Sequence, residues 1–283
     1  MSDSPVTSFS AQSSMNALWQ ARYGTKPPEK PLPESPVARS LMAHRSVRHF
    51  SPAPLPEGVV EAAIAAAQSA SSSCNLQAWS VIAVRDPARR ARLARIAGDQ
   101  AFIAQAPLFL AWVVDLSRLE HVGHAQGHAL PGLDCLDTFL GGVVDTALAG
   151  QNAAATFESY GLGIVYVGAV RNQPEAIAAE LGLPPRTFAL FGMSVGYPDR
   201  ARPTAIKPRL PQASVLHEER YNPATATDDA SIRAYDACLE ASRAGARSWS
   251  ESVVARLGDV GALHGREHLP ATLRALGFVL GKA

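Results

Sequence analysis

The chain has 283 residues, 47% of them hydrophobic and 18% charged, which suits one large domain or two small ones and excludes a wholly disordered protein. Lys and Arg number 26 and Asp and Glu 25, so the net charge is +1 and no global positive field indicates a nucleic-acid partner. The three cysteines, Cys74, Cys135 and Cys238, are far apart and odd in number, which argues against a disulfide framework and a cysteine-based zinc site.

The first residues lack the basic start and apolar stretch of a secretory signal, and no run of about 18 apolar residues occurs anywhere. We therefore expect a soluble, cytoplasmic protein without a membrane partner. Residues 1–34 are rich in Ser and Pro and end in KPPEKPLPESP, where the prolines lack the backbone N–H that regular structure needs. We predict that this N-terminal arm is mobile or lies along the surface, and that residues 35–283 form one domain with a helical excursion from about residue 228.

Short apolar runs alternate with segments of helical periodicity along the rest of the chain. Runs of β-branched and aromatic residues predict buried strands over 79–84, 108–114, 164–167 and 188–195. Helical spacing of apolar residues predicts helices over 37–44, 56–70, 87–97, 133–160 and 174–181. The alternation predicts layers of helices and strands, with the longest helix at the centre.

Three polar clusters offer donors for an anionic ligand. HRSVRHF, residues 44–50, combines guanidinium forks, ring N–H groups and a hydroxyl, all suited to a phosphate or an anionic ring edge. KPRLP, residues 207–211, holds two cations in a fixed relation between prolines, and SSSCNLQ, residues 71–77, gathers short polar side chains at a helix end. Taken alone, the first is better explained as a solvated basic turn and the second as a surface loop, whereas for the third an ordinary polar cap is as plausible as a ligand site.

Two further patterns favour a structural explanation. GMSVG, residues 192–196, matches the G-x-S-x-G elbow, but Pro198 follows too soon for the helix that this elbow needs, so Ser194 is predicted to lie in a strand. Cys74 has no identifiable partner base and is predicted to be a small buried thiol. Neither a complete G-x-G-x-x-G fingerprint nor a P-loop occurs, which argues against the classical dinucleotide and nucleotide folds.

His121, His124 and His128 could line one helical face as metal ligands. Gly123 and Gly127 weaken a helix there, so we expect a flexible polar loop and no metal site.

Taken in chain order, HRSVRHF, SSSCNLQ, GDQ, GVVDTALAGQNAAATFESYGLG, YVGAVRN and KPRLP resemble the flavin-dependent nitroreductase family. They are most similar to its branch of NADPH-dependent, oxygen-insensitive nitroreductases and flavin reductases. The resemblance runs from about Val37 to the C-terminus. It implies an α+β fold with a mixed sheet flanked by helices, in an intertwined homodimer that binds one FMN at each of two interface sites, with the helix at 133–160 in the dimer core.

The resemblance also implies the FMN ligands on each side of the cofactor. His44, Ser46 and Arg48, with Arg45 assisting, would contact the phosphate and the pyrimidine side of the flavin. Lys207 and Arg209 would complete the phosphate site. The other implied contacts are Ser72 and Ser73 from the partner subunit, Gln100 at the pyrimidine edge, and Tyr166, Val167 and Gly168 beside flavin N5.

The sequence departs from the family at one of these positions, because Ala169 stands where a second glycine is usual. Arg243 and Arg266 lie near the positions where this branch carries its NADPH-phosphate arginines, and NADPH is therefore the expected co-substrate.

A cation beside flavin N1 and O2 stabilises the negatively charged two-electron-reduced form, which is the role expected of Arg48. The predicted activity is hydride transfer from NADPH through flavin N5 to nitroaromatic, quinone or flavin acceptors in a ping-pong cycle. One alternative is an NADPH:FMN reductase that releases reduced flavin. Another, of a different class, is a non-catalytic flavin-binding or interaction protein whose Ser/Pro arm contacts the partner.

Overall fold

The computed structural model describes residues 13–242 and 247–281, and the chain divides into two compact units. One unit comprises Met1–Arg45 and Pro203–Leu263, and the other comprises Ser46–Arg202 and His264–Ala283. We call them the helical unit and the sheet unit and describe each by itself.

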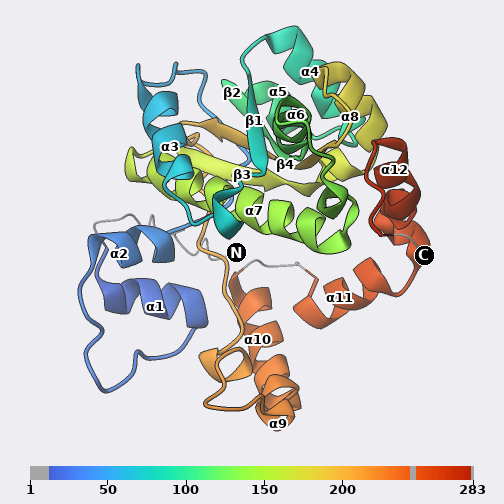
Figure 1. The fold of residues 1–283 in the computed structure, drawn as a ribbon. Helices are drawn as coiled ribbons and strands as arrows, with labels where there is room; N and C mark the ends of the chain where they lie inside the picture. Colours follow the sequence, from blue (N-terminus) through green and yellow to red (C-terminus); the bar gives the residue numbers. More distant parts are fainter. Residues whose placement is uncertain (1–12, 243–246, 282–283) are drawn as a thin grey trace. The chain divides into compact units, whose positions relative to one another are not determined.

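The sheet unit contains a four-stranded sheet of order β1-β2-β4-β3 (Figure 1). All three strand pairings are antiparallel, and an isolated parallel bridge joins Ser46 to Ile164. The sequence predicts β1 with the correct bounds and the other three to within one residue at each end, so these strands are confirmed. The strands are β1 (Trp79–Val84), β2 (Leu108–Asp115), β3 (Gly163–Val167) and β4 (Thr187–Gly196).

Helices cover both faces of this sheet, and all residues of its inner strand β2 are therefore buried. Its alternate residues Leu108, Leu110 and Trp112 pack in a core with α3 and α7, whereas Phe109 and Ala111 pack in a second core with α4, α5 and α8. The predicted α+β architecture, with helices flanking a sheet, is confirmed (Figure 1). These helices are α3 (Val59–Gln68), α4 (Pro87–Ile96), α5 (Ala101–Gln105), α7 (Leu136–Ser159) and α8 (Pro174–Leu181).

The remaining elements complete the two units. The sheet unit adds α6 (Ser117–Ala125), α12 (Leu269–Ala275) and short 3₁₀ turns over Ser73–Asn75, Pro131–Asp134, Gly168–Arg171 and Arg266–His268. The helical unit contains α1 (Met15–Tyr23), α2 (Pro36–Met42), α9 (Pro223–Ala226), α10 (Asp229–Ser242) and α11 (Trp249–Leu257), with 3₁₀ turns over Gln212–Ser214 and Val260–Leu263. The helical character predicted beyond residue 228 is therefore confirmed. Among the described residues, no helix combines the length and apolarity needed to cross a membrane.

Two sequence-based predictions are wrong. The polar loop expected around the histidines is helix α6 up to Ala125, and Gly123 is required there because a Cβ at this position would lie 2.6 Å from Cγ of Leu130. A glycine that marks close packing was thus taken for a helix breaker. Cys74 is exposed rather than buried, and it lies in the short turn over Ser73–Asn75 with a positive φ of 48°. Ser194 lies in β4 as predicted.

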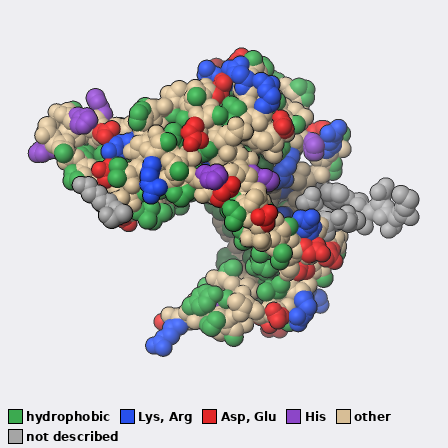
Figure 2. All heavy atoms as spheres, turned by 90° about the vertical axis from the view of Figure 1, so that its right-hand side faces the viewer, with side chains coloured by type: hydrophobic (Ala, Val, Ile, Leu, Met, Phe, Trp, Pro, Cys, Tyr) green, Lys and Arg blue, Asp and Glu red, His purple; other side chains and the backbone are tan. Residues whose placement is uncertain are grey.

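Positive charge gathers on α4 despite the neutral overall balance. Figure 2 shows Lys and Arg side chains along the top of the molecule, at the level where Figure 1 places α4 and α8. Arg89 and Arg92 pair with Glu180 of α8 at 3.2 and 2.9 Å, and hydrogen bonding from Arg92 lowers the pKa of Glu180. These arginines therefore join two helices on one face of the sheet, and part of the cluster's charge is compensated.

Candidate active site

The segment of residues 46–48 lies along β3 and is held there by Val47, whose side chain is buried. The Val47 N–H donates to the Ile164 carbonyl at 2.8 Å, and the Val47 side chain occupies the space that a Cβ on Gly163 would need. Since side chains of an extended segment alternate in direction, Ser46 and Arg48 are directed away from the side on which Val47 is buried. Arg48 is exposed. The predicted flavin ligands of this segment thus lie beside the strand that leads to Tyr166.

In the helical unit, the Arg22 side chain joins two stretches predicted to bind the phosphate, the one that contains His44 and the one over residues 207–209. Arg22 Nη2 donates to the carbonyls of Met42 and His44 at 2.9 and 3.0 Å, and Nη1 donates to the Lys207 carbonyl at 2.8 Å. The Arg209 N–H donates to the Arg22 carbonyl at 2.8 Å. The structure therefore brings the backbone of His44 next to that of the Lys207–Arg209 stretch.

The loop carrying Ser72 and Ser73 is held by a buried carboxylate on α7. Asp145 is 2% exposed and accepts hydrogen bonds from the Ser72 hydroxyl at 2.7 Å and from the Ser73 N–H at 2.9 Å. The Ser72 oxygen also accepts from the Gln77 N–H at 2.9 Å. A hydroxyl has one proton to donate, and that of Ser72 is used within the protein, so Ser73 is the better placed of the two to donate to a ligand.

This loop has an unusual backbone. Cys74, Asn75 and Gln77 all have φ values between 48° and 55°, a region that costs energy for residues other than glycine. Ser72, Asn75 and Gln77 also line a hollow of about 660 Å³ on the sheet unit, next to the apolar side chains of Leu76 and Trp79. A strained loop with polar donors beside an apolar wall is typical of a ligand-binding site.

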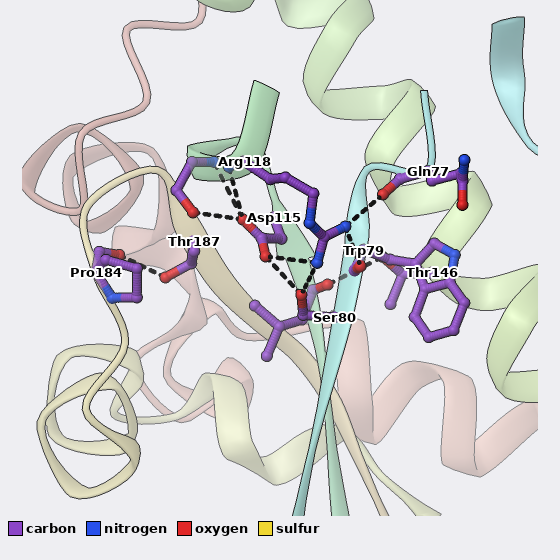
Figure 3. A network of polar contacts seen from close by, with 10 residues as sticks. Gln77, Trp79, Ser80, Asp115, Arg118, Thr146, Pro184 and Thr187 are labelled. Carbon is purple, nitrogen blue, oxygen red and sulfur yellow. Dashed lines mark hydrogen bonds and ion pairs between the residues drawn. The ribbon is translucent and has the colours of Figure 1, made fainter. Parts of the chain in front are cut away.

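A second network anchors the end of the same loop (Figure 3). Arg118 donates to the carbonyls of Gln77 and Trp79 at 3.1 and 3.3 Å and to the Ser80 hydroxyl at 2.8 Å. Asp115 accepts from Ser80 at 2.5 Å and from the Ser117 hydroxyl at 2.6 Å. Burial alone would raise the pKa of Asp115, but these hydrogen bonds and the charge of Arg118 outweigh it, and the pKa is lower than usual.

We predict that Asp115→Asn lowers the free energy of unfolding at neutral pH by about 1–3 kcal/mol, because a buried set of donors loses its charged acceptor. A carboxyl with a lowered folded-state pKa stabilises the protein above the unfolded-state pKa and stops doing so as pH falls through the folded-state value. The difference between wild type and variant should therefore shrink as pH falls below about 4. Urea unfolding over a pH series measures it, with the exposed Glu57→Gln as the control. A difference that does not depend on pH would contradict this assignment.

At the end of β3, Tyr166 is already engaged within the protein. Its hydroxyl donates to Gln151 Oε1 on α7 at 3.2 Å, and its ring meets the Phe191 ring edge-on at 5.2 Å. Burial, with a smaller contribution from Glu158, raises the pKa of Tyr166, so it remains a neutral phenol. Val167 is buried, and Gly168 begins a 3₁₀ turn. This segment is therefore a rigid wall rather than a source of protons.

The remaining predicted residues lie in three places. Gln100 precedes α5, and its Nε2 donates to the Gly98 carbonyl at 3.2 Å. Arg266 Nε donates to Asn172 Oδ1 at 2.9 Å, directly after the 3₁₀ turn that starts at Gly168. Arg243 falls outside the described residues. Among the described residues, no group of three or more potential metal ligands from His, Cys, Asp and Glu is found, and His121 and His124 lie on α6.

Sequence reasoning missed Arg22 and Asp145. Asp145 gave a usable signal, since a carboxylate in the middle of an apolar helix needs a buried partner. Arg22 gave none, because its partner Lys207 lies 185 positions further along the chain.

Comparison with known proteins agrees with this geometry. The model of the nitroreductase family matches residues 41–197, and that of the nitroreductase family C-terminal domain matches residues 207–281. The chain belongs to the nitroreductase family. Helix α1, which carries Arg22, lies outside both family matches.

Similar proteins of this family have been described in several bacteria. The chain is 41% identical over 202 residues to the oxygen-insensitive NADPH nitroreductase of Salmonella typhimurium, covering 71% of this chain and 80% of that protein. It is 35% identical over 245 residues to the NADPH-flavin oxidoreductase of Vibrio harveyi, covering 84% of this chain and 96% of that protein.

Solved structures give the same result for the nitroreductase fold. Nitroreductase A from Vibrio parahaemolyticus has a TM-score of 0.79 at 33% identity, over 87% of this chain and 99% of that one. The NADPH:FMN oxidoreductase from Vibrio harveyi, solved in complex with NAD⁺, has a TM-score of 0.77 at 32% identity, over 86% and 98%.

Proposed function

We propose that this nitroreductase-family chain is an FMN-dependent oxidoreductase that uses NADPH to reduce small acceptors, namely nitroaromatics, quinones or flavins, and works as a cytoplasmic homodimer. The observation that carries the proposal is the joining of His44 to the Lys207–Arg209 stretch. A phosphate monoester carries up to two negative charges and needs several charge-assisted donors from a fixed frame. Arg22 holds the backbone of a histidine next to that of a lysine and an arginine, whose side chains are the donors that we assign to the phosphate.

We assign the other contacts with FMN to residues of the sheet unit. Arg48 supplies an exposed cation for the pyrimidine side of the flavin, and Gln100 Oε1 supplies an acceptor for its ring N–H. Tyr166 supplies an aromatic wall whose hydroxyl is already hydrogen-bonded, and Val167, whose side chain is buried in the core, would contribute only through its backbone. When bound, FMN would accept hydride from NADPH and pass the electrons to the acceptor. The chain itself then has to bind and orient the cofactor and the substrates and to exclude water. Hydrogen-bond donors and apolar side chains are suited to these tasks.

The experiment that tests this function is NADPH oxidation by the purified protein in the presence of single acceptors. We expect turnover with nitroaromatics and quinones that depends on bound FMN and is lost when flavin is removed. NADPH oxidation only when free FMN is added would favour a reductase that releases reduced flavin. Flavin binding without any NADPH oxidation would favour the non-catalytic alternative and contradict the proposal.

Helix α7 supports the proposed homodimer. Leu136, Leu140, Val144 and Leu148 follow one another at four-residue spacing and are 43–54% exposed, while other residues of α7 pack on the sheet. A continuous apolar stripe of this kind on a long helix indicates an interface, and a symmetric one fits a second copy of the chain.

We predict that Leu140→Asp with Val144→Asp converts the dimer to a monomer, because four charges would be buried in a symmetric interface. Sedimentation velocity at micromolar concentration measures the change. The control is Val215→Asp with Val254→Asp, which places the same charges at valines that are 70% and 68% exposed outside the stripe. A wild-type protein that sediments as a monomer would contradict the dimer proposal.

A further inference from the structure

Helix α1 is firmly packed although it lies outside both family matches. The Ser14 side chain accepts from the Ala17 N–H at the start of the helix, and Leu18 is fully buried in a cluster with Ala43 and Ile206. At its end, Gly24 has a φ of 67°, and a Cβ there would lie 2.6 Å from Cys238 Sγ on α10. Packing from three parts of the helical unit therefore fixes the position of α1 within that unit.

Arg22 is the residue through which α1 reaches the predicted phosphate-binding stretches. It is only 9% exposed, and its guanidinium donates to three backbone carbonyls, those of Met42, His44 and Lys207. The planar, multiply donating guanidinium suits this task, because donors on its two terminal nitrogens hold two separate strands of backbone at once. The Arg22 carbonyl in turn accepts from the Arg209 N–H, so the connection runs in both directions.

The intervening residue is held as well. The Tyr235 hydroxyl on α10 donates to the Pro208 carbonyl at 3.2 Å, and Arg209 Nη1 donates to the same carbonyl at 3.1 Å. The backbone of Lys207, Pro208 and Arg209 is thus hydrogen-bonded at each residue. Of these residues, Arg22 is the one that also donates to the carbonyls of Met42 and His44, and it thereby connects the two stretches.

We infer that Arg22 is a positioning residue for the FMN phosphate. It does not bind the phosphate itself but fixes the backbone of His44 and of Lys207–Arg209, so that their side chains converge on one anion. The inference rests on the proposed function, since it requires that these side chains bind the phosphate. It assigns a cofactor-binding role to the arm that precedes the family domain.

The test compares FMN with riboflavin, which has the same ring system but no phosphate. The full-length chain is stripped of flavin and titrated with each ligand while flavin fluorescence is followed. For Arg22→Gln, we expect FMN affinity to fall by roughly tenfold to a hundredfold, with riboflavin affinity changed by less than about twofold. The control is Lys26→Gln, which removes an exposed positive charge from the same arm and should change neither affinity.

Arg22→Lys separates positioning from charge. An ammonium keeps the positive charge but lacks the fork that spans three carbonyls, so we expect it to restore only a minor part of the FMN affinity. If Arg22→Gln does not fold, the comparison of FMN with riboflavin is made with Arg22→Lys instead. Amide hydrogen exchange at Lys207 and Arg209 in the flavin-free protein should be faster in Arg22→Lys than in wild type.

The outcomes distinguish this inference from the proposed function. If Lys207→Ala with Arg209→Ala loses FMN selectively and the Arg22 variants do not, the positioning role is overturned and the phosphate site stands. If the double variant itself shows no selective loss, the phosphate assignment is wrong and the inference falls with it. Equal losses of FMN and riboflavin in the Arg22 variants would show a general structural role and also overturn the inference.

Discussion

Lys207→Ala combined with Arg209→Ala is expected to lose FMN at micromolar protein concentration. Each charge-assisted hydrogen bond to a phosphate contributes about 1.5–3 kcal/mol, so removing both weakens binding by about 3–6 kcal/mol, or roughly 150-fold to 25,000-fold. Arg209→Ala removes the contacts of Nη1 with the Lys207 and Pro208 carbonyls, but the fold should survive because Arg22 and Tyr235 still donate to these two carbonyls. Calorimetric titration with FMN measures the loss.

Two controls make this result specific. Riboflavin lacks the phosphate, and its affinity should be almost the same for wild type and variant. Lys26→Ala with Arg220→Ala removes the same charge from exposed positions and should leave FMN binding unchanged. Full FMN occupancy in Lys207→Ala with Arg209→Ala would contradict the assignment of these residues to the phosphate.

Arg266→Ala is expected to raise the KM for NADPH by an amount equivalent to about 1.5–3 kcal/mol, or roughly tenfold to 150-fold, and to leave NADH use almost unchanged. The reason is the 2′-phosphate of NADPH, which a guanidinium fork recognises and NADH lacks. The hydrogen bond from Arg266 Nε to Asn172 fixes this side chain next to the turn that starts at Gly168. Steady-state kcat/KM for both donors measures the effect.

Asn172→Ala and Arg274→Ala complete this experiment. The first removes the hydrogen-bond partner of Arg266 and should reproduce part of its effect on NADPH. The second removes an exposed charge on α12 and should have none. Equal losses with NADH and NADPH in Arg266→Ala would mean that the residue is structural, and a wild-type protein indifferent between the two donors would overturn the NADPH preference.

Most of the sheet unit could be predicted from the sequence because its elements carry strong local signals. WSVIAV and LFLAWVVD are apolar runs bounded by polar residues or proline, and they form β1 and β2. Pro174 at the first position of α8 marked the start of that helix. The long helix α7 begins three residues later than predicted, after a 3₁₀ turn over Pro131–Asp134, and ends one residue earlier.

The parts that could not be predicted depend on tertiary contacts. Helix α1 has nine residues beside a proline-rich stretch, and its stability comes from burying Leu18 against Ala43 and Ile206, which sequence periodicity does not reveal. Similarly, Gly123 reads as a helix breaker until Leu130 is seen to pack against it.

The sequence shows the separate segments that we predict to bind FMN, but not the contacts that connect them. Polar clusters such as HRSVRHF and KPRLP are visible in the sequence, whereas the residues that hold them are single side chains in apolar surroundings. Arg22 and Asp145 each bond to backbone or hydroxyl groups that are distant in sequence. Such pairings follow from the fold rather than from local composition.

The central claim is that this chain carries FMN as the acceptor of electrons from NADPH. Anaerobic titration of the purified, yellow protein with NADPH tests it most directly. We predict that the visible flavin band bleaches in proportion to added NADPH and that bleaching is complete at one NADPH per bound FMN. The band should return when a nitroaromatic or quinone is added. A flavin band that stays unchanged in excess NADPH, or a purified protein without FMN that does not take it up, would contradict the account.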